Sequence, residues 1–478
     1  MVTHRSHRPV VAIIGGGFTG AALAANLARN TAGRAVDIVV FEPRARLGAG
    51  LAYDTADPAH RINVPAARMS LIPDDPDDFL RWLAAEGEPR DDPGALAEDG
   101  NLYPRRAVFG RYVSDFIAPH LKADQVHHCR ERVGQIVRVG DQWRVNTDGG
   151  TDILADIAIV ATTHPAPCAP QNIAKVLAGH PRYVADSTLR GALSVIRGDD
   201  RVLVIGNGLT AADVIASLRC CGHRGPITAI SRRGLRSRGH ATTAQEPFGD
   251  FVTDPPQTAR SLLRRVRIAL HQAPAEGRSW HAVFDALRTQ GGDIWRALPV
   301  AERKRLVRHL RPYWDVHRFR VAPQIDAVIA EGLEHGDVRV LGGSIGGIDH
   351  DGETIAAAVR HRHSGKREQM LFDACVITTG PAHTGILRSQ NWLADLADAG
   401  HLQLDMVGLG LACDEQSRAT NRDGKSEETL FIAGPLARGT FGELMGLPQV
   451  NDHAIFVADQ VAQRLARRSR SRAAAKTA

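Results

Sequence analysis

The chain has 478 residues, which is too long for one ordinary domain and suits two or three. Hydrophobic residues make up 43% of the chain and charged residues 23%, an ordinary globular composition. The formal net charge of +6 equals the basic excess of residues 464–478, so the remainder is balanced and a basic nucleic-acid-binding face is excluded. We expect residues 464–478 to form a basic flexible tail.

The six cysteines include no Cys-x-x-Cys pair, so the sequence indicates neither a metal site nor a redox dithiol. Scattered cysteines are typical of proteins in the reducing cytoplasm, which is the expected location. No apolar run reaches the roughly 18 residues that a membrane-spanning helix needs, so no span is predicted.

The first predicted unit begins with the apolar run 10–14, which is typical of a strand buried on both faces of a parallel sheet. A glycine turn follows, then a helical pattern over 21–29 and a second apolar strand over 36–41. This order of strand, turn, helix and strand predicts a βαβ unit.

The glycines of this turn fit the fingerprint of dinucleotide-binding proteins. Gly15 allows the tight turn, Gly17 lets a pyrophosphate approach the backbone, and Gly20 lets the helix pack on the strand. Glu42 ends the second strand, where an acid accepts the ribose hydroxyls of an adenosine. The cofactor-binding residues expected here are Gly15, Gly17, Phe18, Thr19, Gly20 and Glu42.

Beyond this unit, residues 47–76 are rich in Gly, Pro and Asp and predict a long irregular excursion. Helices are expected over 79–85 and 109–121, and strands over 134–147 and 153–160.

Residues 201–230 repeat the opening pattern. A strand over 201–205 leads into Gly206 and Gly208, and Ala211 stands where a third glycine would be. The strand that follows ends in Ser231, Arg232 and Arg233 instead of an acid.

An acid at the end of this strand would repel a 2′-phosphate, whereas Ser231, Arg232 and Arg233 would bind it through charge-assisted hydrogen bonds. The second unit is therefore predicted to bind NADPH, the alternative being that the arginines are a solvated surface pair. Two dinucleotide sites imply two dinucleotides that exchange a hydride, so FAD is inferred for the first unit.

Residues 259–311 are mostly helical by pattern, strands return over 338–341, 354–359 and 371–378, and a helix is expected over about 450–468.

Longer stretches resemble one family of flavoproteins. They are Gly48-Ala-Gly50-Leu-Ala-Tyr53, His60-Arg-Ile-Asn63-Val-Pro65, residues 75–83, Tyr103-Pro-Arg105 through Tyr112, and Trp295 and Trp314 with residues 317–320. With the two glycine turns, they resemble the FAD-NAD(P)-binding family, whose relatives include flavin-dependent amino-acid N-oxygenases. The resemblance covers nearly the whole chain.

The resemblance implies an α/β fold with two Rossmann-like dinucleotide-binding domains, the NADPH domain inserted in the FAD domain. The expected domains are residues 1–165 and 371–463 for FAD, and 166–370 for NADPH with a helical insertion at about 240–325. It adds the cofactor-binding residues Asn63, Met69, Arg105, Thr162, Gly380 and Gly434. Pro435 stands where many flavoproteins have an acid, which argues against a side-chain contact to the flavin there.

In related monooxygenases a flavin hydroperoxide does the chemistry, so the resemblance requires no obvious catalytic side chain. His317, Arg318 and Arg320 lie beside aromatic residues and are the candidates for binding a carboxylate or the NADPH phosphate. They suggest a small anionic or amino-acid-like substrate. His240 is a weaker candidate of the same kind.

Three functions remain open at this point. The first is an FAD- and NADPH-dependent monooxygenase that uses molecular oxygen on nitrogen or another heteroatom of a small molecule. The second is an NADPH oxidase or reductase that passes electrons to another acceptor, and the third is a non-catalytic flavin-binding sensor. The arginine pair at 232–233 argues against the sensor, because it points to NADPH.

Overall fold

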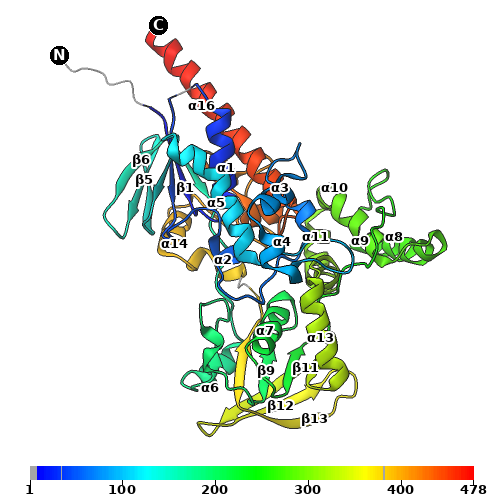
Figure 1. The fold of residues 1–478 in the computed structure, drawn as a ribbon. Coiled ribbons are helices and arrows are strands. Elements are labelled where there is room, and N and C mark those ends of the chain that lie inside the picture. The colour runs from blue at the N-terminus through cyan, green and yellow to red at the C-terminus, as the bar shows by residue number, and fades with distance from the viewer. Residues whose placement is uncertain (1–7, 34, 381–382, 478) are drawn as a thin grey trace.

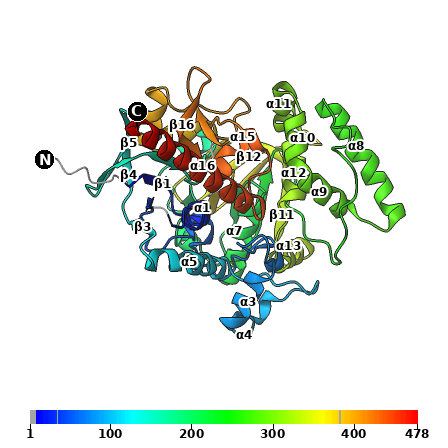
Figure 2. The same cartoon turned by 90° about the horizontal axis from the view of Figure 1, so that it is seen from above.

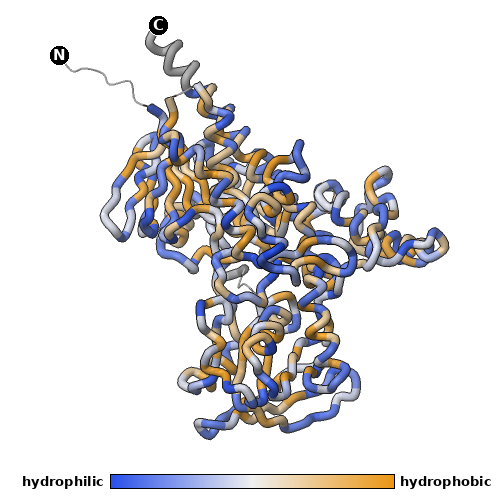
Figure 3. The backbone as a smooth tube through the Cα atoms, viewed as in Figure 1, coloured by the Kyte–Doolittle hydropathy of each residue, from blue (hydrophilic) through white to orange (hydrophobic). Residues whose placement is uncertain are grey.

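The computed structural model describes residues 8–33, 35–380 and 383–477, which form two lobes with a helical projection at one side (Figure 1). Figure 3 shows that hydrophobic residues are concentrated along the central strands of both lobes. None of the helices in the described part of the chain is long and apolar enough to cross a membrane.

The first lobe is built on a six-stranded sheet in the order β15-β16-β7-β1-β2-β3. Its strands are β1 (Val10–Ile14), β2 (Asp37–Phe41), β3 (Val126–Cys129), β7 (Ile157–Val160), β15 (Arg418–Thr420) and β16 (Ser426–Ile432). All neighbouring pairs are parallel except β15 with β16. Strand β7 is buried along its whole length and β1 along nearly all of it, as their apolar sequences predict.

Helices cover one face of this sheet, and a small antiparallel sheet packs on the other. On the first face, α1 (Phe18–Asn30) lies between α5 (Arg106–Lys122) and α16 (Gln449–Thr477), as Figures 1 and 2 show. The smaller elements of the lobe are α2 (Gly50–Tyr53), α3 (Asp78–Ala85), α4 (Glu88–Asp91), α14 (Asn391–Asp398), β4 (Val133–Val139), β5 (Gln142–Thr147) and β6 (Asp152–Ala155). Trp143 and Trp392 bury their side chains between the small sheet, α14 and the main sheet.

The second lobe contains a seven-stranded sheet in the order β13-β12-β11-β10-β9-β14-β8. Its elements are α6 (Gln171–Leu177), β8 (Tyr183–Val184), β9 (Val202–Ile205), α7 (Leu209–Cys220), β10 (Ile227–Ser231), α13 (Pro323–His335), β11 (Val338–His350), β12 (Ile355–His361), β13 (Arg367–Phe372) and β14 (Ala374–Ile377). The chain enters this lobe after β7 and returns to the first sheet at β15. The predicted insertion of one dinucleotide-binding fold in another is therefore confirmed.

One expected domain boundary is wrong. Residue 371 was expected to begin the second part of the first domain, but β13 and β14 both belong to the second sheet. β14 pairs in parallel with β9, with Ala374 opposite Val202, so the chain leaves the second lobe only after Ile377. The motif at 373–380 resembles a linker between domains, but its apolar residues form a buried strand.

The expectation of a flexible tail from residue 464 is also wrong, because α16 continues to Thr477. Arg464 forms an ion pair with Glu428 at 2.9 Å, and Arg468 Nη1 donates to the Asp156 carbonyl at 2.9 Å. These basic side chains find their acceptors elsewhere in the first lobe, which a local excess of positive charge does not reveal.

The helical projection consists of α8 (Ala259–Gln272), α9 (Trp280–Thr289), α10 (Gly291–Ala297), α11 (Val300–His309) and α12 (Arg311–Arg318). It has an apolar cluster of its own, in which Phe251, Val283 and Leu298 are almost completely buried. Helix α13, part of which was assigned to this insertion, packs on α7 and β11 and belongs to the second lobe.

Candidate functional site

The first glycine turn connects β1 to α1 and has no space for side chains. Gly15 has φ +104°, and a Cβ added there would lie 2.6 Å from the Ala161 carbonyl oxygen. A Cβ on Gly20 would lie 1.9 Å from the Gly15 carbonyl oxygen, and one on Gly17 3.2 Å from Gly50. Within the described part of the chain, no side chain caps the N-terminus of α1, so its first N–H groups are open to a ligand. This geometry fits a pyrophosphate.

Glu42 lies over this turn, directly after β2, and is only 4% exposed. Its Oε2 accepts a hydrogen bond from the Gly16 N–H at 3.1 Å, and its Oε1 accepts from the Arg44 backbone N–H at 3.1 Å. The carboxylate is thus held at the end of the strand where a ribose would be bound.

Residues from distant segments converge on the same turn. Gly434, with φ +70°, passes so close to α1 that a Cβ there would lie 2.6 Å from Thr19 Oγ1. The Gly434 N–H donates to Nδ1 of His453 at 3.1 Å. Thr162 directly follows Ala161, beside Gly15, and its backbone comes within 3.0 Å of a Cβ placed there.

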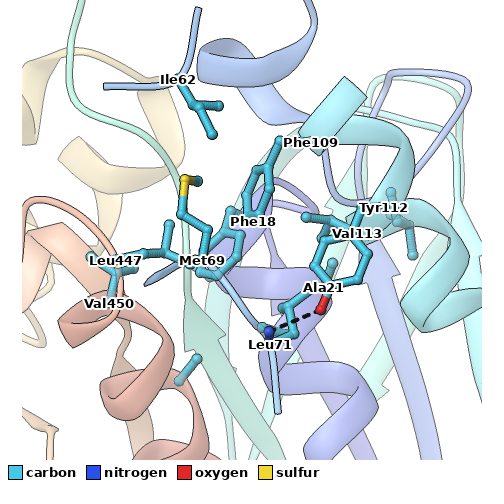
Figure 4. Packing of buried hydrophobic residues seen from close by; sticks show 14 of the residues in the cluster. Phe18, Ala21, Ile62, Met69, Leu71, Phe109, Tyr112, Val113, Leu447 and Val450 are labelled. Carbon is cyan, nitrogen blue, oxygen red and sulfur yellow. Dashed lines mark hydrogen bonds between the residues drawn. The ribbon is translucent and has the colours of Figure 1, made fainter. Parts of the chain in front are cut away.

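An aromatic cluster supports the start of α1 (Figure 4). Phe18 stacks on Phe109 with ring centroids 5.9 Å apart, and Met69 packs in the same apolar cluster. The Tyr112 hydroxyl accepts a hydrogen bond from the Leu71 N–H at 3.1 Å, which fixes the loop that carries Met69. The cluster covers this side of the glycine turn with apolar side chains.

The second glycine turn connects β9 to α7 and is more open. Gly206 has φ +123°, and a Cβ there would lie 2.4 Å from the Thr378 carbonyl oxygen, two residues before Gly380. Around Gly208 a Cβ would meet nothing within 4 Å. Ala211 is 1% exposed, so an alanine fits where the first unit requires Gly20.

The basic residues after β10 lie at the edge of the second lobe. Arg232 is exposed, and Arg233 is half-buried with its guanidinium carbon 5.6 Å from the centre of the Tyr313 ring. Among the described residues neither arginine makes an ion pair, and Nε of Arg233 has no hydrogen-bond partner. Ser231 Oγ accepts from the Gly234 N–H at 3.1 Å, which shapes the turn. The recognition of a 2′-phosphate by this group stays a prediction.

The two units face a common cleft of about 280 Å³. Asn63 and Met69 line it from the first lobe, and Leu209, Thr210 and Asp213 line it from the start of α7. Tyr53 also lines the cleft, and burial raises its pKa to about 12, so its hydroxyl stays protonated at neutral pH.

A buried ion pair joins the lobes across this cleft. Arg106 of α5 donates to both carboxylate oxygens of Asp213 on α7, at 2.8 and 2.9 Å. His60 Nε2 and Ser217 Oγ form a second link at 3.2 Å. The sequence did not lead us to select Arg106 or Asp213. Asp213 is an acid in a mostly apolar helix, and this pattern could have indicated a buried ion pair. The sequence singled out Arg105, which lines a different hollow, together with Ala216 of α7, and lies 3.6 Å from Asp92.

The three candidate catalytic residues do not form one anion-binding cluster. Arg318 is paired with Glu443 at 2.6 Å and Arg320 with Asp285 at 2.8 Å, so the charge of each is already balanced. Arg318 and Arg320 line the cleft, whereas His317 faces a different cavity inside the helical projection. The expectation that these residues jointly bind a substrate carboxylate is therefore not supported by their geometry.

His240 also lines the cleft and ties the insertion to the first lobe. Its Nε2 lies 3.0 Å from the Asn63 carbonyl oxygen, so Nε2 carries the proton and donates. Burial, together with Arg320, lowers the pKa of His240 to about 4. The imidazole is therefore neutral at physiological pH and serves as a hydrogen-bond donor to the loop of Asn63.

The fold and the paired glycine turns define a protein with two dinucleotide-binding units that share one cleft. Residues 12–165 match the model of a family described as FAD-NAD(P)-binding, which confirms the resemblance for the first unit. No curated protein sequence matches this chain.

Solved structures of similar fold include flavin-dependent N-hydroxylating enzymes. The reduced form of ornithine hydroxylase from Pseudomonas aeruginosa has a TM-score of 0.61 and 17% identity, covering 96% of this chain and 100% of that one. L-lysine 6-monooxygenase from Pseudomonas syringae has a TM-score of 0.60 and 18% identity, covering 96% and 99%. The ornithine N-hydroxylase of Kutzneria sp. 744, solved with reduced FAD, NADP+ and L-ornithine, has a TM-score of 0.60 and 16% identity, covering 97% and 100%. At these identities the likeness establishes the fold.

Proposed function

We propose that the protein is an FAD- and NADPH-dependent oxidoreductase, and specifically a monooxygenase that inserts oxygen into a heteroatom of a small molecule. The observation that carries the proposal is the presence of two glycine turns of different character in two lobes that line one cleft. The turn with Glu42 suits the adenosine ribose of FAD, and the turn with Arg232 and Arg233 suits the 2′-phosphate of NADPH. The N-hydroxylating enzymes of the same fold support the choice of a monooxygenase.

The bound flavin would supply the redox chemistry, accepting a hydride from NADPH and activating molecular oxygen. The N-termini of α1 and α7 would bind the two pyrophosphates, and Phe18, Phe109 and Met69 would exclude water from the flavin side. The Arg106–Asp213 pair would hold the lobes at the separation that hydride transfer requires. The free cysteines also support the cytoplasmic location we expect.

The test begins with the protein purified without added cofactor, which should carry yellow FAD. Under anaerobic conditions NADPH should bleach the flavin at least about tenfold more efficiently than NADH, the discrimination that charge-assisted bonds to a phosphate provide. In air, a substrate should convert NADPH consumption from hydrogen peroxide release to oxygenated product. Peroxide release with every amine, thiol and sulfide tried would favour the oxidase, and absence of bleaching would favour the sensor.

A pair of variants tests the role of the cleft. Asp213→Asn should slow flavin reduction by NADPH while FAD remains bound, because it weakens the link between the lobes. The matched control is Asp373→Asn, which weakens a similar bidentate pair with Arg201 in the second lobe, away from the cleft. Equal rates of flavin reduction in the two variants would contradict the proposed role of Asp213.

A further inference from the structure

A second cavity lies inside the helical projection, apart from the cleft. Its volume is about 650 Å³, and it is bounded by α8 to α12 and by the segment of the first lobe that contains α15 (Arg438–Phe441). Cavities of this size hold small organic ligands. Most of the lining is apolar, and it includes three of the six tryptophans, Trp280, Trp295 and Trp314.

The apolar wall of this cavity is incompletely covered by protein. Phe284 stacks on Trp314 with ring centroids 5.9 Å apart and meets the edge of Trp280 at 5.7 Å. Helix α11 buries none of its residues, although Leu306 and Val307 of this helix line the cavity. Leu306 also packs against the apolar cluster of the projection, so this helix face is only partly covered by protein, which favours an apolar ligand.

The inner end of the cavity contains a buried cation. Arg438 is 5% exposed, and among the described residues its Nη1 has no hydrogen-bond partner and its guanidinium no ion pair. Asp315 and Glu443 attract Arg438 only at longer range, because each lies closer to another arginine: Asp315 to Arg311 Nε at 3.2 Å and Glu443 to Arg318 at 2.6 Å. A buried guanidinium without a partner is costly, and an anionic ligand would supply one.

The segment that carries Arg438 is fixed in place against the projection. Nε1 of Trp295 donates to the Gly439 carbonyl oxygen at 2.9 Å. Gly442 has φ +82°, and a Cβ there would lie 2.8 Å from Trp295 Cγ, so only glycine allows this approach. Arg438 is thus held at a defined position of the cavity wall and is not a mobile surface side chain.

We infer that the helical projection is a binding site for a carboxylic acid with an aromatic or branched apolar body. The apolar body lies among Phe284, Trp314 and Leu306, and the carboxylate pairs with Arg438. The Arg318–Glu443 pair stands between this site and the cleft, since Arg318 lines the cleft and Glu443 lines the cavity. Binding of a ligand at this site can be measured without turnover, so its test is independent of the proposed redox function.

The test measures binding of two probes with the same carbon skeleton, 4-phenylbutyrate and 4-phenylbutan-1-ol, to the purified full-length protein. Titration calorimetry gives the affinities, and quenching of tryptophan fluorescence reports on Trp280, Trp295 and Trp314. The acid should bind about tenfold more tightly than the alcohol, because it alone forms a charge-assisted bond.

Four variants locate the interaction. Arg438→Gln should abolish the preference for the acid, whereas Arg267→Gln, which removes an exposed arginine at the rim of the same cavity, should keep it. Val266→Trp should fill the cavity and weaken both probes alike. Arg438→Lys controls for a loss of stability in Arg438→Gln. The two variants should unfold at the same temperature, but only the lysine, which keeps a positive charge, should retain part of the preference for the acid.

Equal affinity of the two probes for the unmodified protein would overturn the inference, as would a preference that survives in Arg438→Gln. Unchanged binding in Val266→Trp would place the probes outside the cavity and would also overturn it. A protein that binds the acid as expected but shows no NADPH-driven flavin reduction would contradict the proposed function and leave this site intact.

Discussion

The two glycine turns share the order of strand, turn and helix but differ in how closely the protein encloses them. Around the first, Gly15, Gly20 and Gly434 all contact backbone or side chains at distances that exclude a Cβ. Around the second, only Gly206 is so confined. A Cβ on Gly208 would meet no neighbouring atom, and Ala211 stands where the third glycine of the first turn, Gly20, stands. We therefore expect the first turn to tolerate substitution of its glycines less well than the second.

The largest effect is expected for Gly20→Ala. The added methyl would overlap the Gly15 carbonyl oxygen, so the helix must move from the strand at a cost of several kcal/mol, on the order of 3 or more. The variant should lose FAD and unfold at a lower temperature, as absorbance of the purified protein and calorimetry will show. Gly208→Ala is the matched control and should keep FAD; loss of flavin in both would mean that the turns are equally confined.

Acid is expected to weaken the first lobe through His453. Burial lowers the pKa of His453 from 6.5 to about 4. Its Nδ1 accepts from the Gly434 N–H and its ring lies against Phe441. Between these two pKa values the unfolded chain binds a proton that the folded chain does not, so stability falls as the pH falls through this window. The loss is on the order of 2–3 kcal/mol.

His453→Asn tests this contribution, since its Oδ1 can accept from Gly434 but does not titrate. The free energy of unfolding, measured in urea between pH 7 and pH 4, should fall less steeply in the variant. Because His164 and His240 have similarly lowered pKa values, part of the slope should remain. An unchanged slope would show that His453 is not the group responsible.

Glu42→Gln should weaken FAD binding by about 10- to 100-fold and leave the affinity for NADPH unchanged. The amide keeps an acceptor for Gly16 but loses the charge that favours the ribose hydroxyls, a loss of roughly 1.5–3 kcal/mol. Equilibrium dialysis of the flavin measures the effect. Equal weakening of FAD and NADPH would indicate a general loss of structure.

The smallest effect is expected at the second turn. Arg232→Ala and Arg233→Ala should each raise the KM for NADPH by about tenfold and leave that for NADH unchanged, because only NADPH carries the 2′-phosphate. Steady-state oxidation of both nucleotides measures this. If NADH oxidation fell equally, the arginines would have a structural role, for example through the contact of Arg233 with Tyr313.

The sequence predicted the features whose chemistry is local. Gly15, Gly20 and Glu42 lie within one βαβ unit, and their spacing alone indicates the turn and the acid at its edge. The Arg106–Asp213 pair joins residues 107 positions apart and the Arg318–Glu443 pair residues 125 apart, and neither partner identifies the other without the fold. Arg318 was therefore interpreted as an available cation, although the fold neutralises it.

The place where the second lobe joins the first sheet determines whether the first lobe can be separated from it. The chain departs after β7 and returns at β15, which leads into β16, and β16 is the hydrogen-bonded neighbour of β7 in the first sheet. Removing residues 166–378 and bridging the gap with a short linker would interrupt no strand of that sheet. All six strands of the first sheet lie outside residues 166–378, so we expect the first lobe to fold and to bind flavin without the second.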